Sequence, residues 1–188
     1  VLGQYRGYGA EAGVSAGSKT ETFAAMALYL DSWRWQGVPF YVRAGKRLPV
    51  AATEVVVELR RPPQQVFDAP ARGPANYVRF RLGPGSVAIA IGARTKKPGA
   101  TMVGNDVELY VCNEKGGDSN AYERLLGDAI RGDTTLFARW DGVEAAWRVV
   151  DPVLGRGTPV HEYDPGTWGP PAAAALFSGW RDPAADCA

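Results

Sequence analysis

Two short basic segments are the parts of the sequence best suited to chemistry. One is Arg43-Ala44-Gly45-Lys46-Arg47, which follows an apolar stretch, and the other is Thr95-Lys96-Lys97-Pro98-Gly99. A glycine beside a lysine at the end of a strand lets the backbone approach an anion while the ammonium group reaches it. Lys46 is therefore a candidate anion-binding residue. Taken alone, both segments are equally consistent with ordinary solvated turns.

Several other kinds of site have no support in the sequence. His161 is the only histidine, and it lies in a segment expected to be an irregular connection, so a surface or packing role is predicted for it rather than a catalytic one. Cys112 and Cys187 lie 75 residues apart without CxxC spacing. That spacing argues against a metal site or a disulfide framework and favours a reducing, cytoplasmic compartment. Neither GxGxxG nor GxxxxGK[ST] occurs, and no catalytic residue is predicted in this chain.

Charge is balanced over the whole chain but uneven along it. The 188 residues carry a formal net charge of +1, yet residues 1–100 hold 14 Lys and Arg against 6 Asp and Glu. A basic half attracts phosphates, nucleic acid or an acidic partner. A nucleic-acid surface is not predicted, because Phe80 alternates away from Arg79 and Arg81 and the net charge is close to zero. A membrane span is not expected either, because no run of 18 apolar residues occurs.

The elements that must position these residues predict an α+β fold. A helix is expected from a capping box at Ser18 and Glu21 to a stop at Gly37. Alternating or apolar runs predict strands at 38–43, 53–60, 76–82, 87–91 and 106–112. Helices are expected at 120–130, capped by Asn120, and at 141–154, with a short Ala-rich segment at 170–177. Because the strands are grouped, we expect a mainly antiparallel sheet with helices packed on one side.

Seven segments, in order along the chain, resemble glucose-6-phosphate dehydrogenase. They are Gly3-Gln4-Tyr5, Thr20-Glu21-Thr22-Phe23, the block from Arg34 to Pro49, Lys96-Lys97-Pro98-Gly99, the block from Tyr122 to Asp133, Glu144-Ala145-Ala146-Trp147-Arg148, and Trp168-Gly169-Pro170. The block from Arg34 to Pro49 is the most specific, and the resemblance covers nearly the whole chain. It implies that residues 1–188 are a portion of that family's C-terminal β+α domain, with the dinucleotide-binding domain absent.

The resemblance also implies an activity. The family oxidises C1 of glucose 6-phosphate with NADP, in the pentose phosphate pathway, and a histidine outside the segments matched here takes the hydroxyl proton. The chain alone is therefore expected to be inactive. The lysine of the family's Arg-x-Gly-Lys motif corresponds to Lys46, which implies that Lys46 binds the substrate phosphate or sugar. Arg43 corresponds to a position that contacts a second, structural NADP in some members, and a homodimer through the large sheet is implied as well.

The sequence departs from the family at several positions. Ala51 stands where a second basic residue is usual, and Gly83 precedes Pro84 where the family often has glutamine. Losing one charge-assisted phosphate contact costs about 1.5–3 kcal/mol, so weaker binding of glucose 6-phosphate or another phosphosugar stays open. Ala52, Val56 and Gly92 lack the basic groups that would complete a structural NADP site. The alternative reading is a stand-alone, non-catalytic regulatory or assembly module derived from the same domain.

Overall fold

The structure, a computed structural model, describes residues 1–64, 66–67, 75–83, 86–99, 101–114, 121–154 and 157–183. The chain divides into two compact units. The first unit comprises Val1–Pro49 with Asp118–Trp180, and the second comprises Val50–Gly117 with Arg181–Ala188. The predicted α+β class with antiparallel strands is confirmed. The described strands form two four-stranded sheets, however, where one sheet was expected.

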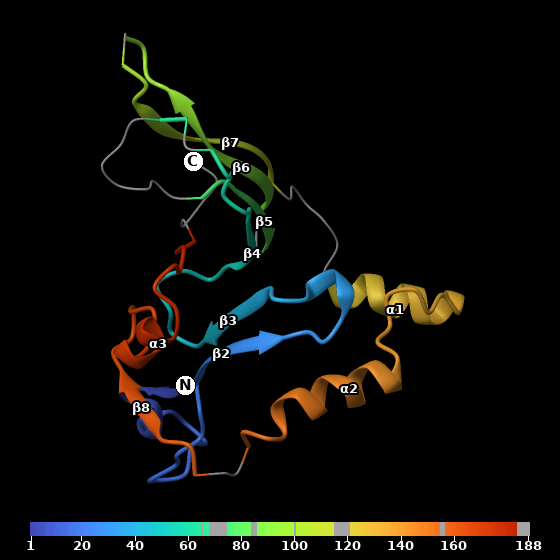
Figure 1. Cartoon of the computed structure of the whole chain (residues 1–188). Helices are drawn as coiled ribbons and strands as arrows, with labels where there is room; N and C mark the ends of the chain where they lie inside the picture. The colour runs from blue at the N-terminus through green and yellow to red at the C-terminus, as the bar shows by residue number, and fades with distance from the viewer. Residues whose placement is uncertain are drawn as a thin grey trace. The chain divides into compact units, whose positions relative to one another are not determined.

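The first unit is built on a sheet with the strand order β3-β2-β1-β8 (Figure 1). Its strands are β1 (Leu2–Tyr5), β2 (Phe23–Tyr29), β3 (Pro39–Gly45) and β8 (Val160–Tyr163). β2 runs antiparallel to both β1 and β3, whereas β1 and β8 are parallel. The sequence analysis missed β1 and β8, because four residues are too few to establish an alternating pattern.

The core of the first unit is a small aromatic cluster. Its buried members are Tyr5, Phe23, Ala25, Tyr163 and Ala173. The Phe23 and Tyr163 ring centroids lie 5.5 Å apart, and the rings of Tyr5 and Tyr163 meet edge to face. Such tilted and edge-to-face contacts suit the aromatic quadrupole and add to the burial energy. The cluster therefore ties β1, β2 and β8 together beside the end of β3.

The helix predicted from Ser18 to Gly37 is wrong. Residues Phe23–Tyr29 form strand β2, and only Trp33–Trp35 make a short 3₁₀ helix. Phe23 and Ala25 are both buried, which is the two-residue period of a strand. Hydrogen bonds to strands on both sides outweigh the helical preference of an alanine-rich run, which is a weak local bias. The Ser18 hydroxyl donates to the Thr20 hydroxyl instead of capping a helix.

The second unit contains an antiparallel sheet with the strand order β4-β5-β6-β7. Its strands are β4 (Thr53–Glu58), β5 (Tyr77–Gly83), β6 (Ser86–Lys96) and β7 (Gly104–Glu114), which confirms all four strands predicted in this region. β6 and β7 are longer than predicted. Alternation separates an apolar face from a charged one. The exposed members of the apolar face include Val55, Val57, Ile89, Ile91, Leu109 and Val111.

The charged face of this sheet pairs its arginines with carboxylates. Arg79 donates to Glu108, and Arg81 Nη1 lies 3.5 Å from Glu54 Oε1. Arg94 lies 3.7 Å from Asp106 on the neighbouring strand. Much of the positive charge in the basic half of the sequence is thus compensated inside the sheet, by acids that are mostly remote in sequence.

The described helices are α1 (Ala121–Arg131), α2 (Trp140–Val150) and α3 (Pro171–Leu176), close to the three predicted segments. α3 packs against β2. Asn120, the predicted cap of the first helix, lies outside the described residues. Over the residues that are described, no helix is long and apolar enough to cross a membrane. Cys112 is disulfide-bonded, although the cysteine spacing argued against a disulfide framework.

We expect Phe23→Ala to destabilise the protein by about 3–5 kcal/mol, because the ring is lost from a packed core. Phe23 is 2% exposed, whereas Trp33 is 99% exposed, so Trp33→Ala is the control and should change stability little. Urea unfolding followed by circular dichroism measures both. Equal effects of the two substitutions would contradict the assignment of Phe23 to the core.

Candidate functional site

Lys46 directly follows β3, which ends at Gly45. Its side chain is exposed. Among the described residues, no acceptor forms a hydrogen bond or ion pair with its ammonium group. An exposed ammonium without an internal carboxylate partner keeps its full charge for an external anion. This is the arrangement that the anion-binding role predicted for Lys46 requires.

The backbone around Lys46 is held from three directions. The Lys46 N–H donates to the Thr22 carbonyl at 2.8 Å, and the Tyr163 hydroxyl donates to the Lys46 carbonyl at 2.7 Å. The Gly166 N–H donates to the Arg47 carbonyl, also at 2.8 Å. Thr22 precedes the turn in the sequence, whereas Tyr163 and Gly166 lie more than 100 residues after it. The tertiary fold, rather than the local turn, therefore fixes the position of the lysine.

Arg47 completes the turn in a conformation that is unusual for a residue with a side chain. Its φ is 53°, in the left-handed region. The guanidinium Nη2 donates to Glu11 Oε1 at 2.9 Å, and the Tyr5 hydroxyl donates to the same oxygen at 3.0 Å. The hydrogen bond from Arg47 holds the pKa of the Glu11 carboxyl below its ordinary value, and Tyr5 adds to this effect. The Arg47 guanidinium thus pairs with a carboxylate of its own protein, whereas the Lys46 ammonium has no such partner among the described residues.

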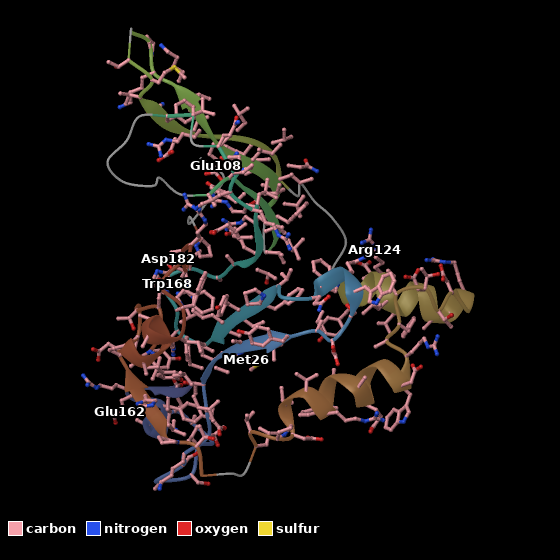
Figure 2. The ribbon with its side chains drawn as sticks, in the orientation of Figure 1. Met26, Glu108, Arg124, Glu162, Trp168 and Asp182 are labelled. Carbon is pink, nitrogen blue, oxygen red and sulfur yellow. The ribbon has the colours of Figure 1, made fainter. Side chains whose placement is uncertain are left out.

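Arg43 lies on β3 against two indole rings. Its guanidinium carbon is 4.6 Å from the ring centroid of Trp168 and 4.8 Å from that of Trp180. Trp168 lies near α3 (Figure 2), and Trp180 Nε1 donates to the Ala173 carbonyl of that helix. Cation–π contacts of this kind contribute about 0.5–2 kcal/mol. Arg43 therefore ties β3 to the C-terminal segment, and its predicted contact with a cofactor stays a prediction.

The remaining candidates belong to other elements. His161 is exposed on β8. In the second basic segment, Lys96 Nζ donates to the carbonyls of Lys97 and Gly99, so this ammonium closes its own turn. Gly83 ends β5 with a φ of 132°, a conformation that favours glycine. Among the described residues, no group of three or more His, Cys, Asp or Glu is placed to hold a metal ion.

Sequence reasoning missed the groups that hold Lys46 and its neighbour Arg47 in place. Thr22 lay inside the wrongly predicted helix, and Tyr163 lay in a segment expected to be irregular. Glu11 precedes every predicted element. The sequence contained one indication of Thr22: it belongs to Thr20-Glu21-Thr22-Phe23, one of the seven segments that carry the resemblance. Phe23 opens β2 opposite Gly45, the residue before Lys46.

Comparison with known proteins establishes the family to which the chain belongs. The model of the "Glucose-6-phosphate dehydrogenase, C-terminal domain" family matches residues 1–182. The chain belongs to this family. The match includes both sheets, all three described helices and the turn that carries Lys46, so the resemblance inferred from seven segments is confirmed.

Individual relatives agree with the family match. The chain is 43% identical to glucose-6-phosphate 1-dehydrogenase from Aggregatibacter actinomycetemcomitans and 41% identical to glucose-6-phosphate 1-dehydrogenase 1 from Mycobacterium tuberculosis strain H37Rv. Each comparison covers 97% of this chain and 40% of the relative. The chain thus spans about two fifths of the length of these curated relatives.

Solved structures support the same fold. The crystal structure of glucose-6-phosphate 1-dehydrogenase from Mycobacterium avium matches with a TM-score of 0.84 and 39% identity, over 97% of this chain and 40% of that one. A glucose-6-phosphate dehydrogenase solved in complex with glucose 6-phosphate matches with a TM-score of 0.77 and 27% identity, over 98% of this chain and 41% of that one.

We expect Gly45→Ala to destabilise the protein by about 1–3 kcal/mol, the usual cost of overpacking. A Cβ at Gly45 would lie 2.8 Å from Phe23 Cδ2 and 3.2 Å from Leu48 Cδ2. Gly9→Ala is the control, because no heavy atom lies within 4 Å of a Cβ built there. Urea denaturation compares the two variants. A Gly45→Ala protein as stable as Gly9→Ala would contradict the close packing of Phe23 against the turn.

Glu11→Gln should lower stability at neutral pH and have little effect in acid. A carboxyl whose pKa is lowered on folding stabilises the protein above its ordinary pKa, and this contribution disappears as the pH falls through the lowered pKa. The thermal midpoints of the two proteins should therefore differ at about pH 7 and converge as the pH falls through the lowered pKa of Glu11. A difference that stays constant over this series would show that the Arg47–Glu11 pair is not its source.

Proposed function

We propose that this chain is the C-terminal domain of an NADP-dependent glucose-6-phosphate 1-dehydrogenase, which oxidises glucose 6-phosphate to 6-phosphogluconolactone. The observation that carries the proposal is the family match over residues 1–182, with Lys46 held at the end of β3 inside it. The relatives are oxidoreductases of glucose metabolism by name, and one matched dehydrogenase was solved with glucose 6-phosphate bound.

In this proposal the chain contributes to substrate binding rather than to the chemical step. The Lys46 ammonium binds the phosphate or sugar oxygens of glucose 6-phosphate as a charge-assisted donor. In the reaction, the C1 hydroxyl loses its proton to a base and C1 loses a hydride to NADP. In this proposal this chain provides neither the base nor the binding site of the NADP that accepts the hydride. His161 is exposed on β8, and Arg43, the residue predicted to contact NADP, lies against two indole rings. The isolated chain is therefore proposed to be inactive.

We expect Lys46→Ala, in the complete enzyme, to raise KM for glucose 6-phosphate about 10- to 100-fold. That range corresponds to the loss of about 1.5–3 kcal/mol from one charge-assisted contact. KM for NADP should stay within about twofold, because the lysine contacts only the sugar phosphate in this account. Steady-state kinetics with each substrate varied in turn separates the two constants.

Lys19→Ala is the matched control, because Lys19 is also an exposed lysine of the first unit. It should leave both constants unchanged. Unchanged constants for Lys46→Ala would remove Lys46 from the substrate site. An equal rise for both substrates would show a general defect instead. If the complete protein oxidised another phosphosugar in place of glucose 6-phosphate, that sugar would replace glucose 6-phosphate as the proposed substrate. Ala51 and Gly83, which depart from the family pattern, suggest this outcome.

We also propose that the enzyme is a homodimer through the sheet of the second unit. The support is the apolar face of that sheet, where Ile89 pairs with Val111 and Ile91 with Leu109 and all four side chains are exposed. Exposed apolar rows of this kind lower the free energy when a second copy covers them, by about 25 cal/mol per Å² buried. A two-fold axis would place the same face on both copies.

Ile89→Glu should shift the protein from dimer to monomer in sedimentation velocity, because an unpaired carboxylate would be buried at the interface. Leu136→Glu is the matched control: Ile89 and Leu136 are both 56% exposed, but Leu136 lies outside the sheet. A dimer that survives Ile89→Glu, or that dissociates equally with Leu136→Glu, would contradict this interface.

A further inference from the structure

The backbone of Lys46 is hydrogen-bonded at both its donor and its acceptor. Its N–H donates to the Thr22 carbonyl at 2.8 Å, and its carbonyl accepts from the Tyr163 hydroxyl at 2.7 Å. Thr22 and Tyr163 are 9% and 3% exposed, so water competes little for these bonds. The position of the Lys46 Cα is therefore set from the core, while its ammonium stays in solvent.

The Tyr163 hydroxyl has one proton and three oxygens near it. The Lys46 carbonyl is nearest at 2.7 Å, and the carbonyl and hydroxyl of Thr22 are each at 3.2 Å. With the proton directed at Lys46, the Thr22 hydroxyl donates to the Tyr163 oxygen and accepts the Tyr5 N–H at 3.0 Å. Each of these two hydroxyls then both donates and accepts a hydrogen bond, an arrangement in which neighbouring hydrogen bonds strengthen one another.

The bond to Lys46 matters because the turn is not held by local preference. Arg47, the next residue, has a φ of 53°, which a residue with a side chain adopts only when its surroundings enforce it. The Gly166 N–H enforces it from the following side, at the Arg47 carbonyl. Without the phenol hydroxyl, the preceding carbonyl would lose its anchor, and the turn would relax toward other conformations.

We propose that Tyr163 is a positioning residue for substrate binding: its hydroxyl holds the Lys46 carbonyl and so aims the Lys46 ammonium. This inference rests on the proposed role of Lys46 in binding glucose 6-phosphate. The ring of Tyr163 packs against Phe23 and Tyr5 and belongs to the core, whereas the hydroxyl serves the turn. Phenylalanine keeps the first of these roles and removes only the second.

Tyr163→Phe in the complete enzyme should raise KM for glucose 6-phosphate about three- to tenfold, the range of one neutral hydrogen bond. KM for NADP should not change. Phe177→Leu is the stability control, because Phe177 stacks on Tyr41 in the same unit and makes no bond to the turn. It should lower the thermal midpoint without raising KM for the sugar phosphate. An equal rise in both variants would assign the effect to general destabilisation and overturn the proposal.

A second pair of variants tests the hydrogen-bonded hydroxyls of Thr22 and Tyr163 without altering Tyr163. Thr22→Val removes the hydroxyl that accepts the Tyr5 N–H, and Thr22→Ser retains it. The proposal predicts a higher KM for glucose 6-phosphate in Thr22→Val and a near-normal value in Thr22→Ser. If serine and valine raise KM equally, the hydroxyl is not what matters, and the proposal fails.

The double variant Lys46→Ala with Tyr163→Phe distinguishes this inference from the proposed function. If Tyr163 acts through Lys46, adding Tyr163→Phe to Lys46→Ala should not raise KM further. If Lys46→Ala raises KM and Tyr163→Phe alone does not, the positioning role is overturned and the role of Lys46 stands. If Lys46→Ala has no effect, the substrate role fails, and the positioning role fails with it.

Discussion

The hydrogen bond from the buried Tyr163 hydroxyl to the Lys46 carbonyl is the contact on which the candidate site depends. It joins residues 117 positions apart in the sequence and exists only when β8 pairs with β1. The same pairing buries the Tyr163 ring against Phe23. Packing of the core and presentation of the lysine are thus consequences of one strand pairing, so a change that loosens β8 affects both.

The charge distribution separates cations with structural partners from the one proposed to bind substrate. Arg79, Arg81 and Arg94 pair with carboxylates within the second sheet. Arg47 pairs with Glu11 beside the turn, and Arg43 lies against two indole rings. A cation that is already paired gains less from a new anion than one in water, since it must give up the first contact. Lys46 has no such partner among the described residues.

Part of this arrangement followed from the sequence alone. Alternating or apolar runs located β3 to β7, because strands with one polar face carry their period in the residue types. The run at 53–60 extends two residues past the end of β4, and β6 and β7 are longer than predicted. β2 was mistaken for a helix because Phe23, Ala27 and Leu30 also fit helical spacing, and only the neighbouring strands decide between the two. β1 and β8 were missed because they are short. The lysine was found from its glycine and strand. Tyr163 and Thr22 contact its backbone, and Glu11 contacts the neighbouring Arg47, only through the tertiary fold.

The central claim is that Lys46 binds glucose 6-phosphate in the complete enzyme. A crystal structure of that enzyme with glucose 6-phosphate bound tests it most directly. The account predicts the Lys46 Nζ about 2.7–3.2 Å from a phosphate or sugar oxygen, with the Tyr163 hydroxyl still on the Lys46 carbonyl. A bound sugar phosphate whose oxygens all lie beyond about 6 Å from Nζ, too far for a direct contact or one bridging water, would contradict it.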